Sequence, residues 1–249
     1  MKKIIFLLLF CSGFVLAQNL NTIAILYFDN ASLEDREKLE PMRKGLADMF
    51  VTEMIKVKGL KITDRNRIQS LIDEMNLNEL DIVNESTQQK MGKILGAQYM
   101  LFGTFNNLPS DEIRIDARVV KVETSEILFA EEETGDVDEL MELIQSITKK
   151  IAKNLNVKLS KTEEKNLETE SADFDAYYNY YVAIDLDDEA RKLTREGKFD
   201  EAISKIEKAK TYFDKAFSLA KNYEQAKIKS AETISYKEKI NQLKNKPKE

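Results

Sequence analysis

The chain has 249 residues and an acidic composition, with 38 lysines and arginines against 44 aspartates and glutamates and a formal net charge of −6. It contains no histidine and a single cysteine, Cys11. The missing histidine excludes a Ser-His-Asp relay, and the acidic balance argues against nucleic acid as a partner, because that binding depends on neutralising phosphates.

The first residues follow the order of a secretory signal. Met1, Lys2 and Lys3 precede an apolar run, residues 4–16, and a small residue, Ala17, follows. The run is shorter than the roughly 20 apolar residues that a membrane-spanning helix needs. We therefore expect residues 1–17 to be a signal peptide that is cleaved after Ala17, which leaves a periplasmic protein, with association to the outer membrane as a second interpretation. Loss of the two lysines would change the net charge from −6 to −8.

Cys11 raises the alternative of a lipid-modified N-terminus. Phe10 is bulky where lipoprotein processing requires a small residue, and residues 14–16 continue the apolar run beyond the cysteine. We therefore favour a cysteine inside the discarded segment. The mature chain would then contain no cysteine, and so no disulfide, no thiol nucleophile and no zinc site of the Cys/His kind.

The first half of the chain predicts an α/β domain over residues 18–157. Residues 23–28 form a short apolar run, which is typical of a strand buried on both faces. Pro41 suits a first helical turn, and apolar residues follow it at helical spacing up to Gly59. Residues 60–62 predict a second strand, and a helix with one apolar side comes after it.

The rest of this half adds two further helices and three strands. Ser86 and Gln89 have the spacing of a capping box, and Gly96 would end that helix. Apolar or alternating strands are predicted at 99–105, 113–119 and 127–130, and an amphipathic helix at 137–155. The expected order is βαβααβββα, which makes a mixed sheet of about five strands with helical cover.

Residues 158–171 are polar and nearly free of bulky apolar groups, so we expect a linker there, with transient helix allowed. Residues 172–249 are helical almost throughout. Apolar and small residues there, including the stretch 197–202, resemble a tetratricopeptide repeat in their spacing. Little more than one repeat is present, so this all-α module should lean on the first domain, on a second copy or on a partner.

Five segments of the first half resemble the curli assembly and transport component (CsgG) family in the same order. They are 23–30, 45–49, 62–74, 95–103 and the hairpin 115–128, where Ser125 stands in a turn at which family members commonly have glycine. The resemblance implies a cell-envelope domain without a catalytic centre, with envelope proteins or peptides as partners and self-association into a homo-oligomer as a further possibility.

Two alternatives to a binding protein stay open. A subunit of an outer-membrane secretion channel is the first, although the alternating stretch 112–122 is already assigned to the domain's own sheet. A periplasmic enzyme is the second, although no carboxylate pair is forced together by its spacing and no glycine-rich phosphate loop occurs. We expect a non-enzymatic adaptor in secretion or envelope assembly, with no cofactor, no metal site, and peripheral contact with the membrane allowed.

Four tyrosines in the helical half are the candidate partner-binding residues: Tyr177, Tyr178, Tyr180 and Tyr181. Positions one and three apart on a helix point in different directions, so the four cannot share one core. One interpretation is that two or three pack between helices; the other is an aromatic recognition face for a peptide.

Overall fold

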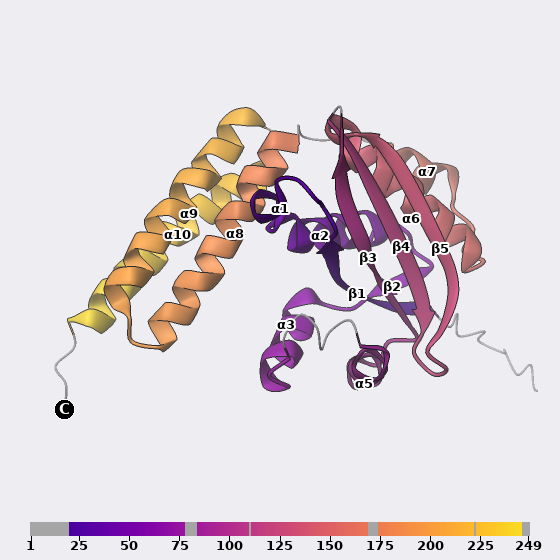
Figure 1. Ribbon diagram of the computed structural model, residues 1–249, viewed down its shortest axis with the longest axis horizontal. Helices are drawn as coiled ribbons and strands as arrows, with labels where there is room; N and C mark the ends of the chain where they lie inside the picture. The colour runs from indigo at the N-terminus through magenta and orange to yellow at the C-terminus, as the bar shows by residue number, and fades with distance from the viewer. Residues whose placement is uncertain (1–19, 78–83, 110, 169–173, 222, 246–249) are drawn as a thin grey trace, which may run out of the picture.

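The computed structural model describes residues 20–245, apart from 78–83, 110, 169–173 and 222, so the predicted signal segment lies outside the described residues. An α/β domain is followed by an α-helical module (Figure 1). The elements of the domain are β1 (Asn21–Asn30), α1 (Arg36–Leu39), α2 (Met42–Met54), β2 (Leu60–Ile62), α3 (Arg65–Glu74), α5 (Glu85–Leu95), β3 (Tyr99–Leu108), β4 (Glu112–Lys121), β5 (Glu126–Asp136), the 3-10 turn η1 (Val137–Glu139) and α6 (Leu140–Asn154). After them come α7 (Lys161–Asn166), α8 (Phe174–Arg195), α9 (Phe199–Leu219) and α10 (Glu224–Lys244).

The predicted mixed sheet is confirmed. It has five strands in the order β2-β1-β3-β4-β5, with β1 parallel to both of its neighbours and β3, β4 and β5 antiparallel. The alternating stretch predicted around residues 113–119 is β4, which pairs with β3 on one side and with β5 on the other. In the part of the chain that the structure describes, no helix is both long and apolar enough to cross a membrane.

Strand β1 is buried on both faces, as its apolar run predicted. Ile23 and Ile25 pack into a core cluster with α2 and α6, whereas Ala24 and Leu26 pack into a second cluster with α3 and α5. The helix that follows β1 therefore covers one face of the sheet, and the helix that follows β2 covers the other.

The start of α5 differs from the prediction. The N-cap is Asn84, whose side chain accepts a hydrogen bond from the backbone N–H of Ser86, so Ser86 lies inside the helix. Asparagine and serine are about equally good N-cap residues. Here Asn84, which comes first in the chain, accepts a backbone N–H that has no partner within the helix. Gly96 ends the helix with φ of +67°, a left-handed conformation that favours glycine, which confirms the predicted stop.

The segment expected to be a linker contains helix α7. Ser160 and Glu163 form a capping box, and the second carboxylate oxygen of Glu163 accepts the backbone N–H of Lys58 at 2.8 Å. The side chain of Leu167 is 0% exposed and belongs to the core that includes α2 and α6. This part of the segment is thus docked on the α/β domain.

The helical module leans on the first domain. Helices α8, α9 and α10 pack in sequence, and α8 also lies against α2. The approach of α8 is close because Gly45 on α2 has no side chain: a Cβ atom there would lie 2.7 Å from the ring of Tyr181. Phe213 of α9 belongs to the same core cluster as Phe28 and Phe50 of the domain, so one apolar core spans both parts.

Strand β5 forms one edge of the sheet and is longer than predicted, because its pairing with β4 continues to Asp136. This extension contains Glu131, Glu132 and Glu133, of which Glu131 and Glu133 face α6 and pair with Lys150. Glu132, on the opposite face, pairs with Arg114 of β4. Residues 131–133 are therefore part of a paired β-strand that carries acidic side chains on both of its faces.

Candidate functional site: a groove between the two modules

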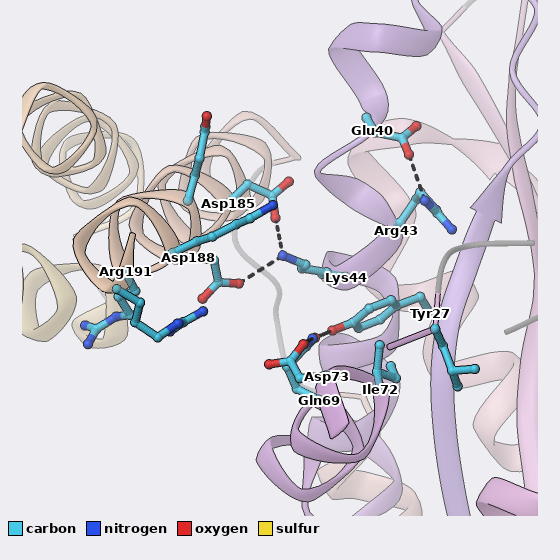
Figure 2. A pocket seen from close by; sticks show the side chains of 14 residues that line it. Tyr27, Glu40, Arg43, Lys44, Gln69, Ile72, Asp73, Asp185, Asp188 and Arg191 are labelled. Carbon is cyan, nitrogen blue, oxygen red and sulfur yellow. Dashed lines mark hydrogen bonds and ion pairs between the residues drawn. The ribbon is translucent and has the colours of Figure 1, made fainter. Parts of the chain in front are cut away.

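A groove of about 620 Å³ lies between α2, α3 and α8, at the carboxyl ends of β1 and β2. The chain leaves β1 toward α2 on one face of the sheet and leaves β2 toward α3 on the other, so a crevice opens between the two helices. Ligands of open α/β sheets commonly bind where successive connections go to opposite faces. Figure 2 shows how the lining side chains gather there. The groove is lined by Tyr27, Glu40, Arg43, Lys44, Gln69, Ile72, Asp73, Leu77, Asp185, Asp188, Glu189, Arg191, Lys192 and Arg195.

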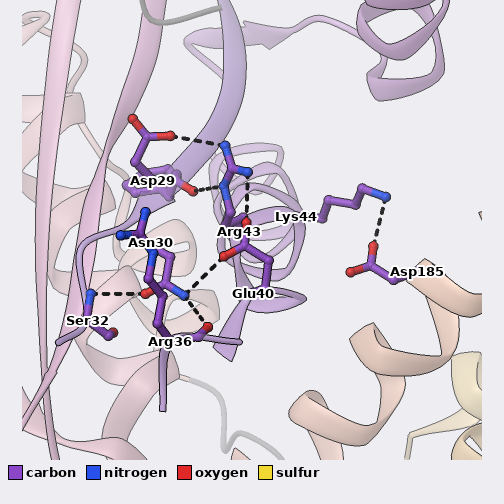
Figure 3. Close-up of polar contacts among 9 residues, drawn as sticks. Asp29, Asn30, Ser32, Arg36, Glu40, Arg43, Lys44 and Asp185 are labelled. Carbon is purple, nitrogen blue, oxygen red and sulfur yellow. Dashed lines mark hydrogen bonds and ion pairs between the residues drawn. The ribbon is translucent and has the colours of Figure 1, made fainter. Parts of the chain in front are cut away.

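Arg43 fixes the α2 wall of the groove. Its guanidinium contacts Asp29 at 3.1 Å and Glu40 at 2.9 Å, and its Nε donates to the backbone carbonyl of Phe28 at 3.3 Å (Figure 3). Asn30 continues the network by donating to the carbonyl of Arg36 at 2.8 Å. These bonds tie the end of β1 to the start of α2, so the wall is rigid at this point.

Lys44 lies one residue further along α2 and reaches across to α8. Its Nζ atom lies 2.8 Å from Asp185 and 2.9 Å from Asp188 (Figure 2). Burial alone would lower the pKa of Lys44, but the attraction of the two carboxylates and their hydrogen bonds outweigh it and raise the pKa above its ordinary value. Lys44 is therefore a permanent cation that links the two modules across the groove.

The α3 wall combines polar and apolar groups. The Tyr27 hydroxyl donates to the side-chain oxygen of Gln69, whose amide nitrogen donates to Asp73 at 2.9 Å. Ile72 and Leu77 add apolar surface to the same wall. This wall can thus contact an apolar side chain of a ligand. The hydrogen bonds from Tyr27 to Gln69 and from Gln69 to Asp73 hold the polar side chains beside it.

The C-terminal half of α8 gives the third wall three basic side chains beside three acidic ones: Arg191, Lys192 and Arg195, with Asp185, Asp188 and Glu189. Arg191 pairs with Asp187 at 2.7 Å and lies 4.3 Å from the centre of the Tyr236 ring. Glu189 pairs with Lys205 of α9 at 2.7 Å. Lys192 and Arg195 are exposed, and neither takes part in an ion pair within the described ranges. They are thus positioned to meet a carboxylate on a ligand.

This arrangement is suited to binding. Paired charges hold the walls, two cations stay available, and apolar side chains line one side, which is the mixture found at protein recognition sites. Among the residues that the structure describes, no group of three or more acidic, histidine or cysteine side chains could hold a metal ion.

The four predicted tyrosines divide into two pairs. Tyr180 and Tyr181 are buried, and their rings meet edge to face at 5.1 Å. Tyr177 and Tyr178 are half-buried; Tyr177 packs against Tyr223 and Tyr178 against Phe174. A recognition face at this end of α8 could draw only on the half-buried pair, and partner binding by these tyrosines stays a prediction.

The groove was not predicted from the sequence. Its residues come from β1, α2, α3 and α8, and the spacing of charges along each of these helices resembles that of an ordinary solvated surface. One signal could have indicated it: Lys44 precedes Gly45 at a position where the apolar face of α2 begins, so a helix packed on Gly45 would bring its own charges to the lysine.

Part of the chain matches a known protein family. Residues 17–110 match the family model of the curli production assembly/transport component CsgG. The match includes four of the five segments on which the resemblance was based, and the hairpin at 115–128 lies beyond it. The tetratricopeptide character of the helical module stays a prediction.

Similar proteins were also found. A putative adenylate cyclase 3 from Rhizobium meliloti is 27% identical over 148 residues, which is 59% of this chain but only 23% of that protein. Lipoprotein GNA1162 from Neisseria meningitidis is 15% identical, with a TM-score of 0.42 over 53% of this chain and 96% of that one. The C-terminal domain of LpoB from Salmonella enterica is 16% identical, with a TM-score of 0.32 over 47% and 83% of the two chains. From β1 to the end of β3, this chain thus carries a CsgG-family match.

Proposed function

We propose that the protein is a non-enzymatic adaptor of the cell envelope, whose groove receives an acidic segment of a partner polypeptide. The observation that carries this proposal is the construction of the groove from two modules. Helices α2 and α3 of the α/β domain supply two walls, and α8 of the helical module supplies the third. A ligand seated there contacts both modules at once, which is what an adaptor requires.

The charges of the groove favour an acidic partner. Arg43, Lys44 and Arg191 are paired with carboxylates of the chain itself, as is Glu189 with a lysine. Among the described lining residues, what remains without an ion pair is the cationic pair Lys192 and Arg195 and one carboxylate on the α3 wall, Asp73, which accepts a hydrogen bond from Gln69. An aspartate or glutamate next to an apolar residue on the partner would meet the two cations and the apolar part of the α3 wall.

Two sequence features support an envelope location. Residues 1–17 have the order of a secretory signal, and the matching family is named for assembly and transport of curli. We extend the family's setting to this chain as part of the proposal: export to the periplasm, partners among envelope proteins, and no catalytic centre.

The proposal is tested by photocrosslinking in intact cells. A photoreactive amino acid replaces Gln69, which lines the groove, and covalent adducts are identified after fractionation of the envelope. We expect a discrete adduct with an envelope protein, and we expect the double variant Lys192→Glu/Arg195→Glu to abolish it. The matched control, Lys208→Glu/Lys215→Glu, reverses two exposed lysines of α9 and should leave the adduct unchanged.

Two results would contradict the adaptor proposal. One is an adduct that survives reversal of Lys192 and Arg195, because the groove's spare cations would then have no part in binding. The other is recovery of the chain in the cytoplasmic fraction alone.

A further inference from the structure

Lysines gather at the end of the sheet where β1 begins, although the chain as a whole is acidic. We define this surface, the lysine-rich end, by six residues from five separate parts of the α/β domain: Lys58, Lys61, Lys93, Lys121, Lys153 and Lys158.

One half of the lysine-rich end is assembled around Asn21. Asn21 is paired in register with Leu60 of β2, and its side chain donates to the carbonyl of Leu155 at 3.4 Å. Gly59 packs so closely on Val157 that an added Cβ atom would lie 2.4 Å from it. The turns that contain Lys58 and Lys61, and those that contain Lys153 and Lys158, are therefore in direct contact.

The other half is assembled around Gln98. The backbone of Gln98 donates to Thr22 at 2.9 Å and accepts from Val122 at 3.0 Å. Lys93 and Lys121 line a shallow cavity of about 350 Å³ beside Gln98. Because Thr22 follows Asn21 in β1, the two halves form one continuous end of the domain.

Some negative charge lies beside these lysines: the exposed carboxylates of Glu164 and Glu168 line a cavity together with Lys153 and Lys158, and Glu168 pairs with Lys149 at 3.2 Å. Lys121 pairs with Glu123 at 3.3 Å, and the nearby carboxylate of Glu163 is buried and occupied by backbone N–H groups. Lys58, Lys61, Lys93, Lys153 and Lys158 are all exposed, and across the described residues none of the five takes part in an ion pair. An exposed apolar side chain, Ile55 at 64% exposure, ends α2 just before Lys58.

We propose that the lysine-rich end adsorbs to the anionic surface of a lipid bilayer. Lysine is a compact, hydrated cation on a flexible stem, which suits the diffuse charge of lipid headgroups, and polybasic clusters are attracted to anionic leaflets. The six residues include no arginine, and the aromatic side chain beside Lys93 and Lys121, that of Tyr99, is half-buried and packs against the core, whereas nucleic-acid bases stack on exposed aromatic faces. The charge therefore fits a membrane better than a nucleic acid, and the opposite end of β1, with the groove, would face away from the bilayer.

The experiment measures sedimentation of the mature form expected after cleavage, residues 18–249, with vesicles of phosphatidylcholine alone and of phosphatidylcholine mixed with phosphatidylglycerol. We expect salt-sensitive binding to the anionic vesicles only. Each basic residue close to an anionic bilayer contributes about fivefold to partitioning, so the variant Lys58→Glu/Lys61→Glu/Lys153→Glu/Lys158→Glu should bind about 100-fold more weakly or worse. A second variant with glutamine at the same four positions tests loss of charge without reversal.

The matched control reverses four exposed lysines of the helical module, at positions 208, 215, 221 and 239, and should bind as the unchanged chain does. Three results would overturn the inference: equal binding to both kinds of vesicle, full binding by the glutamate variant, or preferential binding of DNA or RNA. None of these outcomes involves the groove, so they leave the adaptor proposal unaffected.

Discussion

Lys44 of α2 and Asp185 of α8 lie 2.8 Å apart across the boundary between the two modules. The pair is only partly exposed, at 24% and 33% of the two side chains, so solvent screens it less than an ordinary surface pair. Lys44, Asp185 and Asp188 therefore belong both to the lining of the groove and to the contact between the modules.

Replacement of Lys44 by methionine should weaken the docking of α8. It leaves Asp185 and Asp188 without their cation, and we expect a loss of about 1 kcal/mol in the free energy of unfolding, measured in urea. The raised pKa of Lys44 means that its contribution is complete below the ordinary lysine pKa of about 10.4 and is lost only as the pH rises beyond that value. Lys38→Met, at an exposed position of α1, is the control and should change little.

Gly45→Ala should destabilise the protein, although alanine is the better helix former by about 1 kcal/mol. The added methyl would lie 2.7 Å from the buried ring of Tyr181, and overpacking of this kind costs about 1–3 kcal/mol. We expect a lower thermal midpoint and faster proteolysis between α7 and α8. Combining the change with Tyr181→Leu should recover part of the loss; if it recovers none, the close approach is not the cause.

Glu163 should contribute to acid sensitivity. Hydrogen bonds from Ser160 and from the backbone of Lys58 lower the pKa of Glu163 to about 2. A carboxylate with a lowered folded-state pKa stabilises the fold above its ordinary pKa of about 4.3, and this contribution is lost as the pH falls toward 2. In Glu163→Gln we expect a loss of about 1 kcal/mol at pH 7 and a shallower decline of urea midpoints between pH 5 and pH 2.5. Parallel declines in the two proteins would refute this assignment.

The partner-binding role of the tyrosines can be separated from packing. A photoreactive residue at position 178, which is half-buried, should give an adduct with a partner if the aromatic face is used, whereas one at position 180 should not, because Tyr180 packs against Phe213 and Tyr223. Tyr180→Ala should cost about 3 kcal/mol in stability, while Tyr178→Ala should cost much less. Equal costs would mean that both tyrosines serve the core.

Patterns of period two and period 3.6 predicted the α/β domain well, because they report which face of an element is buried. β4 and α6 follow from such patterns, whereas β1 follows from a continuous apolar run, which is typical of a strand buried on both faces. The predicted N-cap of α5, Ser86, was wrong, and the N-cap is Asn84. Both are good capping residues, and only the tertiary structure selects between them. The docking of α7 within the expected linker is hard to predict from the sequence, because it depends on a single buried apolar residue, Leu167, and on the carboxylate of Glu163, which accepts the backbone N–H of Lys58.

The groove and the lysine-rich end could not be predicted because both are products of tertiary packing. Lys44 and Asp185 are far apart in the sequence, and Lys58 and Lys158 meet only through the contact of Gly59 with Val157. Charged residues at such positions look like ordinary solvent-facing ones until the chain is folded.

The long outer strand β5 has a consequence for how copies of this protein can meet. Its backbone is unpaired along one side, which in many sheets invites a second strand, but Glu126, Glu131, Glu132, Glu133 and Asp136 give it five acidic side chains in eleven residues. Two such strands laid side by side would repel at neutral pH. Pairing of two copies through this edge is therefore disfavoured, and copies of the chain that associate would have to meet through another surface.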